Sequence, residues 1–263
     1  MYILVKDFVN IMSEMIPARL AEDWDNVGLQ VGRNEKEVKV ILCALDFSPE
    51  VLEQASQLHA DIIVTHHPAI FRGIKQFTDQ DWHSALLLEA ARKDIAVYSA
   101  HTNLDSVAGG VNDVLANLLN LENVEGLSGE DTLEGIGRIG VLKEAVELKV
   151  FAENVKKALR LEHVTVIPAG RPVRKVAVCG GSGMDFLDCA VQAGADTYVT
   201  GDVKYHDAQE AKGKHINLID ATHQGTELPV VNELADRLAL RLSREGYTAK
   251  VLVAKETKLL QIV

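Results

Sequence analysis

The stretch KVILCALDFSPEVLEQASQLHADIIVTHHP (residues 39–68) indicates the fold class of this chain. Its first part belongs to an apolar run over 37–45. Ser48 and Pro49 follow, which are typical of a helix N-cap and of the first helical position, and a helical pattern continues to residue 59. A second apolar run, DIIVTHH, comes next. Strand, helix and strand in this order predict a β-α-β unit with parallel strands.

The same alternation extends to both sides of this unit. Patterns of period 3.6 predict helices over 5–15, 81–94 and 109–119, and residues 95–105 read as a strand that runs into a loop. The predicted fold class is therefore α/β. In such sheets, ligands bind beyond the carboxyl ends of the strands, so the residues that follow each strand are the first candidates for a site.

An internal repeat follows from a second copy of the pattern, KVAVCGGSGMDFLDCAVQAGADTYVTGDV (175–203). It aligns Cys43 with Cys179 and, after one deleted residue, Asp61 with Asp196. The next strands, IAVYSAHTNLD (95–105) and INLIDATHQGTE (216–227), each carry a histidine followed four residues later by a carboxylate. We expect two related α/β domains in a pseudo-twofold arrangement, with a site between them.

The expected domain boundary lies near residue 125. The first domain would span 1–125 and the second 126–263. The second would begin with a β-α-β insert over 126–170, for which we expect a structural, packing or oligomer-contact role. The C-terminal strand is a candidate to return to the first domain.

Composition narrows the function classes. The chain has 263 residues, 47% hydrophobic and 25% charged, which is typical of a soluble globular protein. Its net charge of −11 argues against non-specific nucleic-acid binding, which needs a basic excess. Three cysteines without a CxxC pair favour a reducing compartment. No apolar run reaches membrane-spanning length, so we expect a cytoplasmic protein without membrane contact.

Histidines and carboxylates gather at three predicted strand ends. Imidazole and carboxylate donors suit zinc, iron, manganese or cobalt. Adjacent side chains on an extended backbone point in different directions, so a histidine pair can serve two metals, and a carboxylate can bridge ions about 3.5–4 Å apart. The alternative is a set of polar loops that contain histidines by chance. The residues are His66, His67, His101, Asp105, His223 and Glu227.

For three further groups of residues, the sequence allows both a role in the site and a purely structural role. The loop CGGSG (179–183), with Gly181 and Ser182, presents backbone N–H groups that could hold a phosphate, or it is a tight strand–helix turn. Asp202 and His206 line the site or contact substrate, unless Asp202 caps the next helix. Asp46 is either a helix-start residue or a site acid.

Five motifs in order resemble the Nif-three-like family, whose members are named GTP cyclohydrolase 1 type 2 homologues. They are EDWDNVGLQVG, VTHHPAIF, SAHTNLD, GADTYVTGDVKYHDA and DATHQGTELPVV. The resemblance covers nearly the whole chain, in a short form without the extra domain that longer bacterial members carry between the halves. It implies two α/β domains, a dinuclear metal centre between them, and a ring-shaped homohexamer of two stacked trimers.

The resemblance also implies the ligand set and an activity. The ligands of the two divalent ions would be His66, His67, Asp105, His223 and Glu227, with His101 close by as the proton-transfer residue. The expected reaction is hydrolytic opening of the GTP purine ring at C8, with a nucleotide as substrate. The alternative is a non-catalytic metal-binding, scaffold or regulatory protein.

Overall fold

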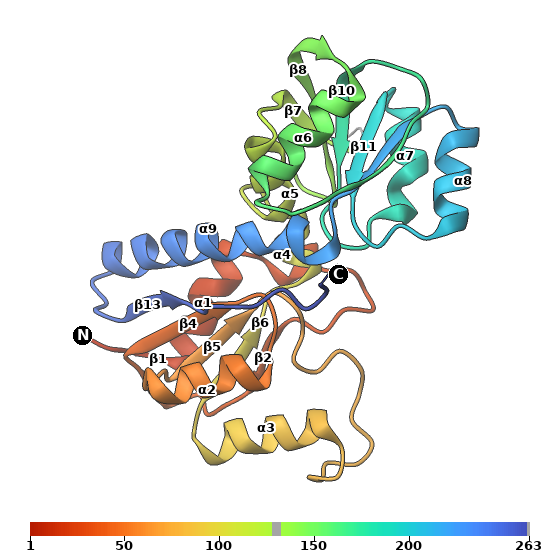
Figure 1. Cartoon of the computed structure of the whole chain (residues 1–263). Helices are drawn as coiled ribbons and strands as arrows, with labels where there is room; N and C mark the ends of the chain where they lie inside the picture. The colour runs from red at the N-terminus through yellow and green to blue at the C-terminus, as the bar shows by residue number, and fades with distance from the viewer. Residues whose placement is uncertain (128–132, 262–263) are drawn as a thin grey trace. The chain divides into compact units, whose positions relative to one another are not determined.

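The computed structural model describes residues 1–127 and 133–261 and confirms the predicted α/β class (Figure 1). It contains two compact units, Met1–Leu104 with Val231–Val263, and Asp105–Val230. These limits differ from the expected ranges 1–125 and 126–263. The first unit ends earlier than expected. It also includes the C-terminal segment, because the last strand (Lys250–Val253) pairs with the strand Val40–Ala44.

The first unit is built on a five-stranded sheet. Four strands are parallel, and the edge strand β2 is antiparallel. In order across the sheet, they are β13 (Lys250–Val253), β4 (Val40–Ala44), β5 (Ile62–Thr65), β6 (Ala96–Ser99) and β2 (Gly28–Val31). A small antiparallel pair, β1 (Ile3–Leu4) and β3 (Glu37–Val38), lies beside α1.

Helices cover both faces of this sheet (Figure 1). Helices α2 (Pro49–Gln57) and α3 (Trp82–Arg92) bury their apolar residues against Leu42, Ile63 and Val97 on one face. Helix α1 (Val5–Met15) packs on the other, where the Phe8 and Tyr98 rings meet edge to face at 5.9 Å. Strand β5 is thus buried on both faces, which explains its continuous apolar run.

The second unit contains a six-stranded sheet. In order across it, the strands are β7 (Glu122–Gly126), β8 (Arg138–Val146), β10 (Val173–Val178), β11 (Thr197–Thr200), β12 (Asn217–Asp220) and β9 (Thr165–Ile167). Strands β10, β11 and β12 are parallel, while β8 and β9 pair with them antiparallel. The segment 126–170, expected as an insert, therefore supplies two strands of this sheet; its residues 128–132 lie outside the described part.

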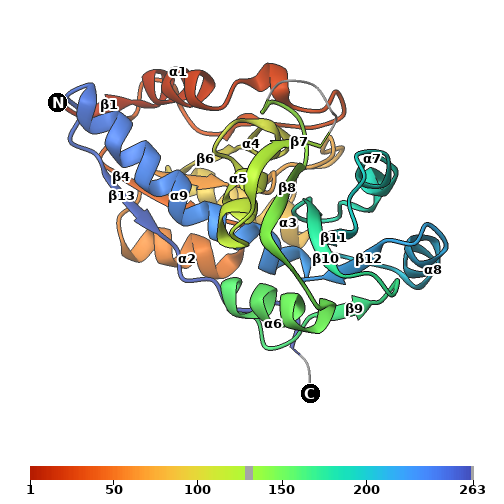
Figure 2. The same cartoon turned by 90° about the horizontal axis from the view of Figure 1, so that it is seen from above.

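Two separate apolar cores flank this second sheet, and alternate residues of each strand enter them. Val178 and Val199 face α5 (Val111–Leu118) and α6 (Leu148–Ala158). Ala177 and Tyr198 face α7 (Leu187–Gln192) and α8 (Tyr205–Gly213). Figure 2 shows the two helix pairs on opposite sides of the sheet.

The internal repeat holds in three dimensions, with one correction. Strand β5 pairs with β4 from Ile41–Ile62 onward, and β11 pairs with β10 from Val176–Thr197 onward, at equal sequence spacing. The structural match therefore needs no deleted residue, and the residue equivalent to Cys43 is Val178 rather than Cys179. The sequence alignment was shifted by one position because it matched the identical pairs Lys39-Val40 and Lys175-Val176.

Two helices carry residues of the candidate site. Helix α4 (Thr102–Ser106) starts directly after His101, where residues 95–105 were expected as a strand running into a loop, and α9 (His223–Arg244) starts at His223. Pro229 lies inside α9. Asp105 and Glu227 are consequently helical residues rather than loop residues. Among the described residues, no helix is long and apolar enough to span a membrane.

Candidate metal centre

Three histidines meet at the carboxyl edge of the first unit's sheet. His66 and His67 follow β5, and His101 follows the adjacent parallel strand β6. The ring centroids lie 5.0 to 5.7 Å apart. Each histidine offers a ring nitrogen within 4.8 Å of those of the other two. This group therefore has the donor atoms and the spacing that a divalent metal requires.

The Nδ1 atom of each of these rings is held by an oxygen. His66 Nδ1 donates to the carbonyl of Ala100 at 3.0 Å, and because a carbonyl only accepts, Nδ1 carries the proton. His67 Nδ1 lies 2.7 Å from Asp46, and His101 Nδ1 lies 2.9 Å from Asp25. With Nδ1 protonated, the neutral ring keeps its lone pair on Nε2. This is how metal-binding histidines are usually oriented.

The contacts of Asp46 with His67 and of Asp25 with His101 give both carboxylates a role in orienting a histidine. Ser48, not Asp46, caps α2, so the reading of Asp46 as a site acid is favoured. Glu256 from the C-terminal segment accepts the backbone N–H groups of Leu45 and Asp46 and fixes this turn. Burial raises the pKa of Glu256.

Sequence reasoning missed Asp25. Its side chain is fully buried, and it also accepts the backbone N–H of Thr102 at 3.0 Å. Burial alone would raise the pKa of Asp25, but hydrogen bonds from His101 and Thr102 outweigh it and lower the pKa to about 2. The carboxylate is therefore charged and holds His101. An acid in the motif EDWDNVG was the only sequence signal, and its partner lies 76 positions away.

In the second unit, His223 and Glu227 lie one turn apart on α9. His223 Nε2 is 3.1 Å from Glu227 Oε2, and His223 Nδ1 is 2.7 Å from Asp202. The start of the helix is set by Thr222, whose hydroxyl accepts the N–H of Gly225 at 3.0 Å. Thr222 has a φ of +63°, a strained value for a β-branched residue. The strained backbone of Thr222 thus lies directly before His223, where the chain turns into α9.

The glycine loop packs against these side chains, and a phosphate-binding role for Gly181 and Ser182 stays a prediction. A Cβ on Gly181 would lie 2.1 Å from Glu227 Oε1 and 3.4 Å from His223 Nε2, and its φ is +65°. The Gly181 N–H donates to Thr226, so it is already used. Ser182 is exposed. The tight-turn reading therefore fits Gly181, which forms a cradle for the carboxylate.

Asp105 is buried on α4, and its carbonyl accepts the side-chain amide of Asn112 at 3.0 Å. Burial raises the pKa of the Cys179 thiol well above its ordinary value, and the charges of Asp105 and Glu227 add to this effect. Both carboxylates thus act on one buried thiol of the second unit. The unit offers one imidazole and two buried carboxylates as metal donors.

Asp202 and His206 have different outcomes. Asp202 orients His223, as described above, and α8 is capped by Lys204 and Asp207 instead. His206 is exposed and its Nδ1 lies 3.1 Å from Gln209, one turn along the same helix. A substrate role for His206 stays a prediction.

Comparisons with known proteins extend over the whole chain. The family model Duf34/NIF3 (NGG1p interacting factor 3) matches residues 3–258. Proteins named "GTP cyclohydrolase 1 type 2 homolog" from Clostridium perfringens and Clostridium acetobutylicum are each 34% identical, with 97% of both chains covered.

Solved structures give the same relationship. A hypothetical protein of Staphylococcus aureus superposes with a TM-score of 0.94 at 27% identity, with all of both chains covered. Reduced HcgD from Methanocaldococcus jannaschii has a TM-score of 0.81 at 31% identity, covering 96% of this chain and 98% of its own.

Proposed function

This chain belongs to the Duf34/NIF3 family, and we propose that it is a hydrolase with two divalent metal ions that opens the purine ring of GTP or a related nucleotide at C8. His66 and His67 from the first unit would hold the ions together with Asp105, His223 and Glu227 from the second. The observation that carries the proposal is the common orientation of the imidazoles. His66, His67 and His223 each have Nδ1 held by an oxygen, which makes Nε2 the ring nitrogen that would bind a metal.

The donor set fits the proposed ions. Imidazole and carboxylate together suit zinc, iron, manganese or cobalt, and five ligands shared by two ions leave positions for water and substrate. Divalent ions bound there would lower the pKa of water towards neutrality and so supply a nucleophile.

His101 is the proposed proton-transfer residue. Its Nδ1 is held by the buried side chain of Asp25, whose pKa is lowered to about 2 and which is therefore a charged acceptor. The ring can therefore take a proton at Nε2 and return it to a leaving nitrogen. Hydrolysis differs from a scaffold role in needing such a proton-transfer group beside the metal ligands, and His101 would supply it.

The test is metal content together with GTP turnover. We expect about two ions per chain in the parent protein, substantial loss of metal in His67→Ala and in Glu227→Ala, and loss of GTP hydrolysis in both. His59→Asn serves as control, since His59 is exposed and lies in a turn of positive φ that asparagine tolerates. Unchanged metal in both variants would refute the centre. Intact metal binding with no turnover of any nucleotide would favour the scaffold role.

Assembly and location form part of the proposal. We infer a cytoplasmic homohexamer, either a trimer of dimers or two stacked trimers. Light scattering of the purified protein should give six times the 28.7 kDa chain mass.

A further inference from the structure

Two large aromatic side chains lie exposed beside His101. Trp24 is 59% exposed and Phe71 is 48% exposed, and their ring centroids are 5.7 Å apart. The His101 ring lies 6.0 Å from Trp24 and 6.2 Å from Phe71, edge to face with both. Single exposed aromatics are ordinary on a protein surface, but this contacting pair lies next to the His101–Asp25 hydrogen bond of the candidate site.

Polar contacts hold both rings in position. Next to Trp24, Asp25 is bonded to His101 and Thr102, and the neighbouring Asn26 donates its side-chain amide to the carbonyl of Ile70. The N–H of Ile70 donates to Gln30 at 2.7 Å. Both backbone groups of the residue before Phe71 are thus tied to the segment that carries Trp24. The pair is preorganised, which reduces the entropy lost when a ligand binds.

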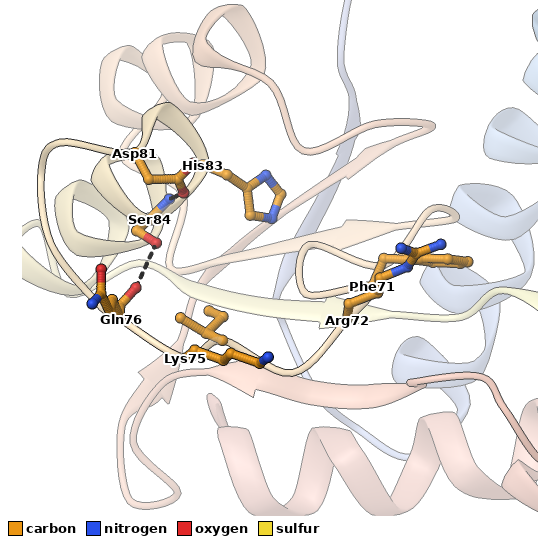
Figure 3. A pocket seen from close by; sticks show the side chains of 8 residues that line it. Phe71, Arg72, Lys75, Gln76, Asp81, His83 and Ser84 are labelled. Carbon is orange, nitrogen blue, oxygen red and sulfur yellow. Dashed lines mark hydrogen bonds between the residues drawn. The ribbon is translucent and has the colours of Figure 1, made fainter.

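Phe71 also forms part of the wall of a depression of about 390 Å³, a size within the range of small-molecule sites. Figure 3 shows Arg72 and Lys75 on the loop that lines it, with Ser84 bonded to the Gln76 carbonyl across it. Within residues 1–127 and 133–261, neither Arg72 nor Lys75 makes an ion pair. Asp81 lines the same depression without pairing with either cation, and in a chain of net charge −11 two basic side chains beside an aromatic pair favour an anionic ligand.

We propose that Trp24 and Phe71 form a stacking surface for the flat heteroaromatic ring of the substrate, and that Arg72 and Lys75 bind its phosphate. The inference rests on the proposed function and assigns the side chains that would bind the base and the phosphate of that nucleotide. The Trp24 and Phe71 rings are tilted by 58° to each other, so a flat ring would stack on one of them and meet the other at its edge, beside His101. Stacking tolerates any base, so the surface selects a ring and a phosphate rather than one particular base.

Tryptophan fluorescence tests the proposal without relying on turnover. The chain has two tryptophans, so Trp82→Phe leaves Trp24 as the single reporter. In the protein as purified, guanosine monophosphate should quench Trp24 emission in a saturable manner, while ribose 5-phosphate, which lacks the ring, should not. Phe71→Ala should weaken the affinity roughly tenfold or more, and Phe71→Tyr should retain it. Arg72→Ala with Lys75→Ala should weaken binding of the nucleotide but not of guanosine.

The outcomes separate this inference from the proposed function. Saturable quenching without any hydrolysis would support the stacking surface and refute only the activity. Normal metal content and GTP turnover with no quenching, or equal quenching by ribose 5-phosphate, would overturn the stacking surface alone. Emission that depends on protein concentration and is insensitive to nucleotide would show that a second copy of the chain covers the pair, which also overturns it.

Discussion

Strands β5 and β11 occupy the same place in their two sheets, yet the loops after them have opposite roles. Each strand is buried and lies between two parallel neighbours. The loop after β5 supplies the imidazoles of His66 and His67, while the loop after β11 supplies Asp202, which holds the imidazole of His223. The shared architecture fixes where a functional side chain stands, and the residue type decides whether it is a donor or an orienting acceptor.

The comparison reveals a common rule. Each candidate ligand histidine is oriented by a group that follows a neighbouring strand. Asp46 follows β4 and holds His67, the Ala100 carbonyl follows β6 and holds His66, and Asp202 follows β11 and holds His223. Parallel strands end at one edge of a sheet, so adjacent loops can form donor–acceptor pairs without close sequence spacing.

The second unit contains a buried ion pair, and breaking this pair should have the largest effect. Arg138 is fully buried and is the one buried cation among the described residues; it forms a two-point ion pair with Asp113 at 2.8 and 3.0 Å. Arg138→Met leaves Asp113 buried without its charge partner and should destabilise the second unit by about 3–5 kcal/mol in urea unfolding.

The matched control for this change is the exposed pair of Lys156 and Glu153. Lys156→Met should cost no more than about 0.5 kcal/mol. The double variant Arg138→Met with Asp113→Leu should recover much of the lost stability, because it removes both charges. A loss below about 1 kcal/mol in the single variant would contradict the account.

Removing one proposed ligand from each half should have the next largest effect. His67→Asn and His223→Asn should each weaken metal binding by more than about 100-fold, beyond the upper end expected for orienting groups. Competition with a fluorescent chelator measures the affinity. A large effect in one half only would show that the halves do not share the centre.

Removing the orienting carboxylates should have a smaller effect, similar in both halves. Asp46→Asn and Asp202→Asn keep an acceptor near Nδ1 but lose its charge, and each should weaken metal binding by about 10-fold. The same chelator assay applies, with exposed Asp188→Asn as control. No change in either variant would mean that the Nδ1 contacts do not tune the site.

The smallest expected effect tests the repeat itself. Asp61 accepts the backbone N–H groups of Lys39 and Val40, and Asp196 accepts those of Arg174 and Lys175. Asp61→Asn and Asp196→Asn should each cost about 0.5–1.5 kcal/mol in urea unfolding, with metal affinity unchanged. Clearly unequal costs would argue that the two contacts are not equivalent.

Much of the fold was predictable from local signals. Helix α1 has the predicted bounds, and β5 was expected from its apolar run. Strand β7 was missed because its residues, ENVEG, carry polar and helix-neutral side chains that only tertiary pairing with β8 makes a strand. The start of α9 at His223 has no clear local signal, because Pro229, a residue type that usually stands in the first helical turn, lies within the helix.

The orienting network was less predictable than the candidate ligands. Histidine and carboxylate types at strand ends pointed to His66, His67 and Glu227. Asp25 could not be found this way, because its contact with His101 arises from the fold and not from spacing. Which ring nitrogen of a histidine carries the proton also depends on the oxygen that it contacts. No residue pattern in the sequence specifies that contact.

X-ray absorption spectroscopy of the metal-loaded protein tests the central claim most directly. The account predicts nitrogen and oxygen scatterers only, imidazole features, and a metal–metal distance of about 3.5–4 Å, with the metal–metal signal lost in Glu227→Ala. Sulfur in the coordination shell, or a mononuclear spectrum at full metal loading, would contradict it.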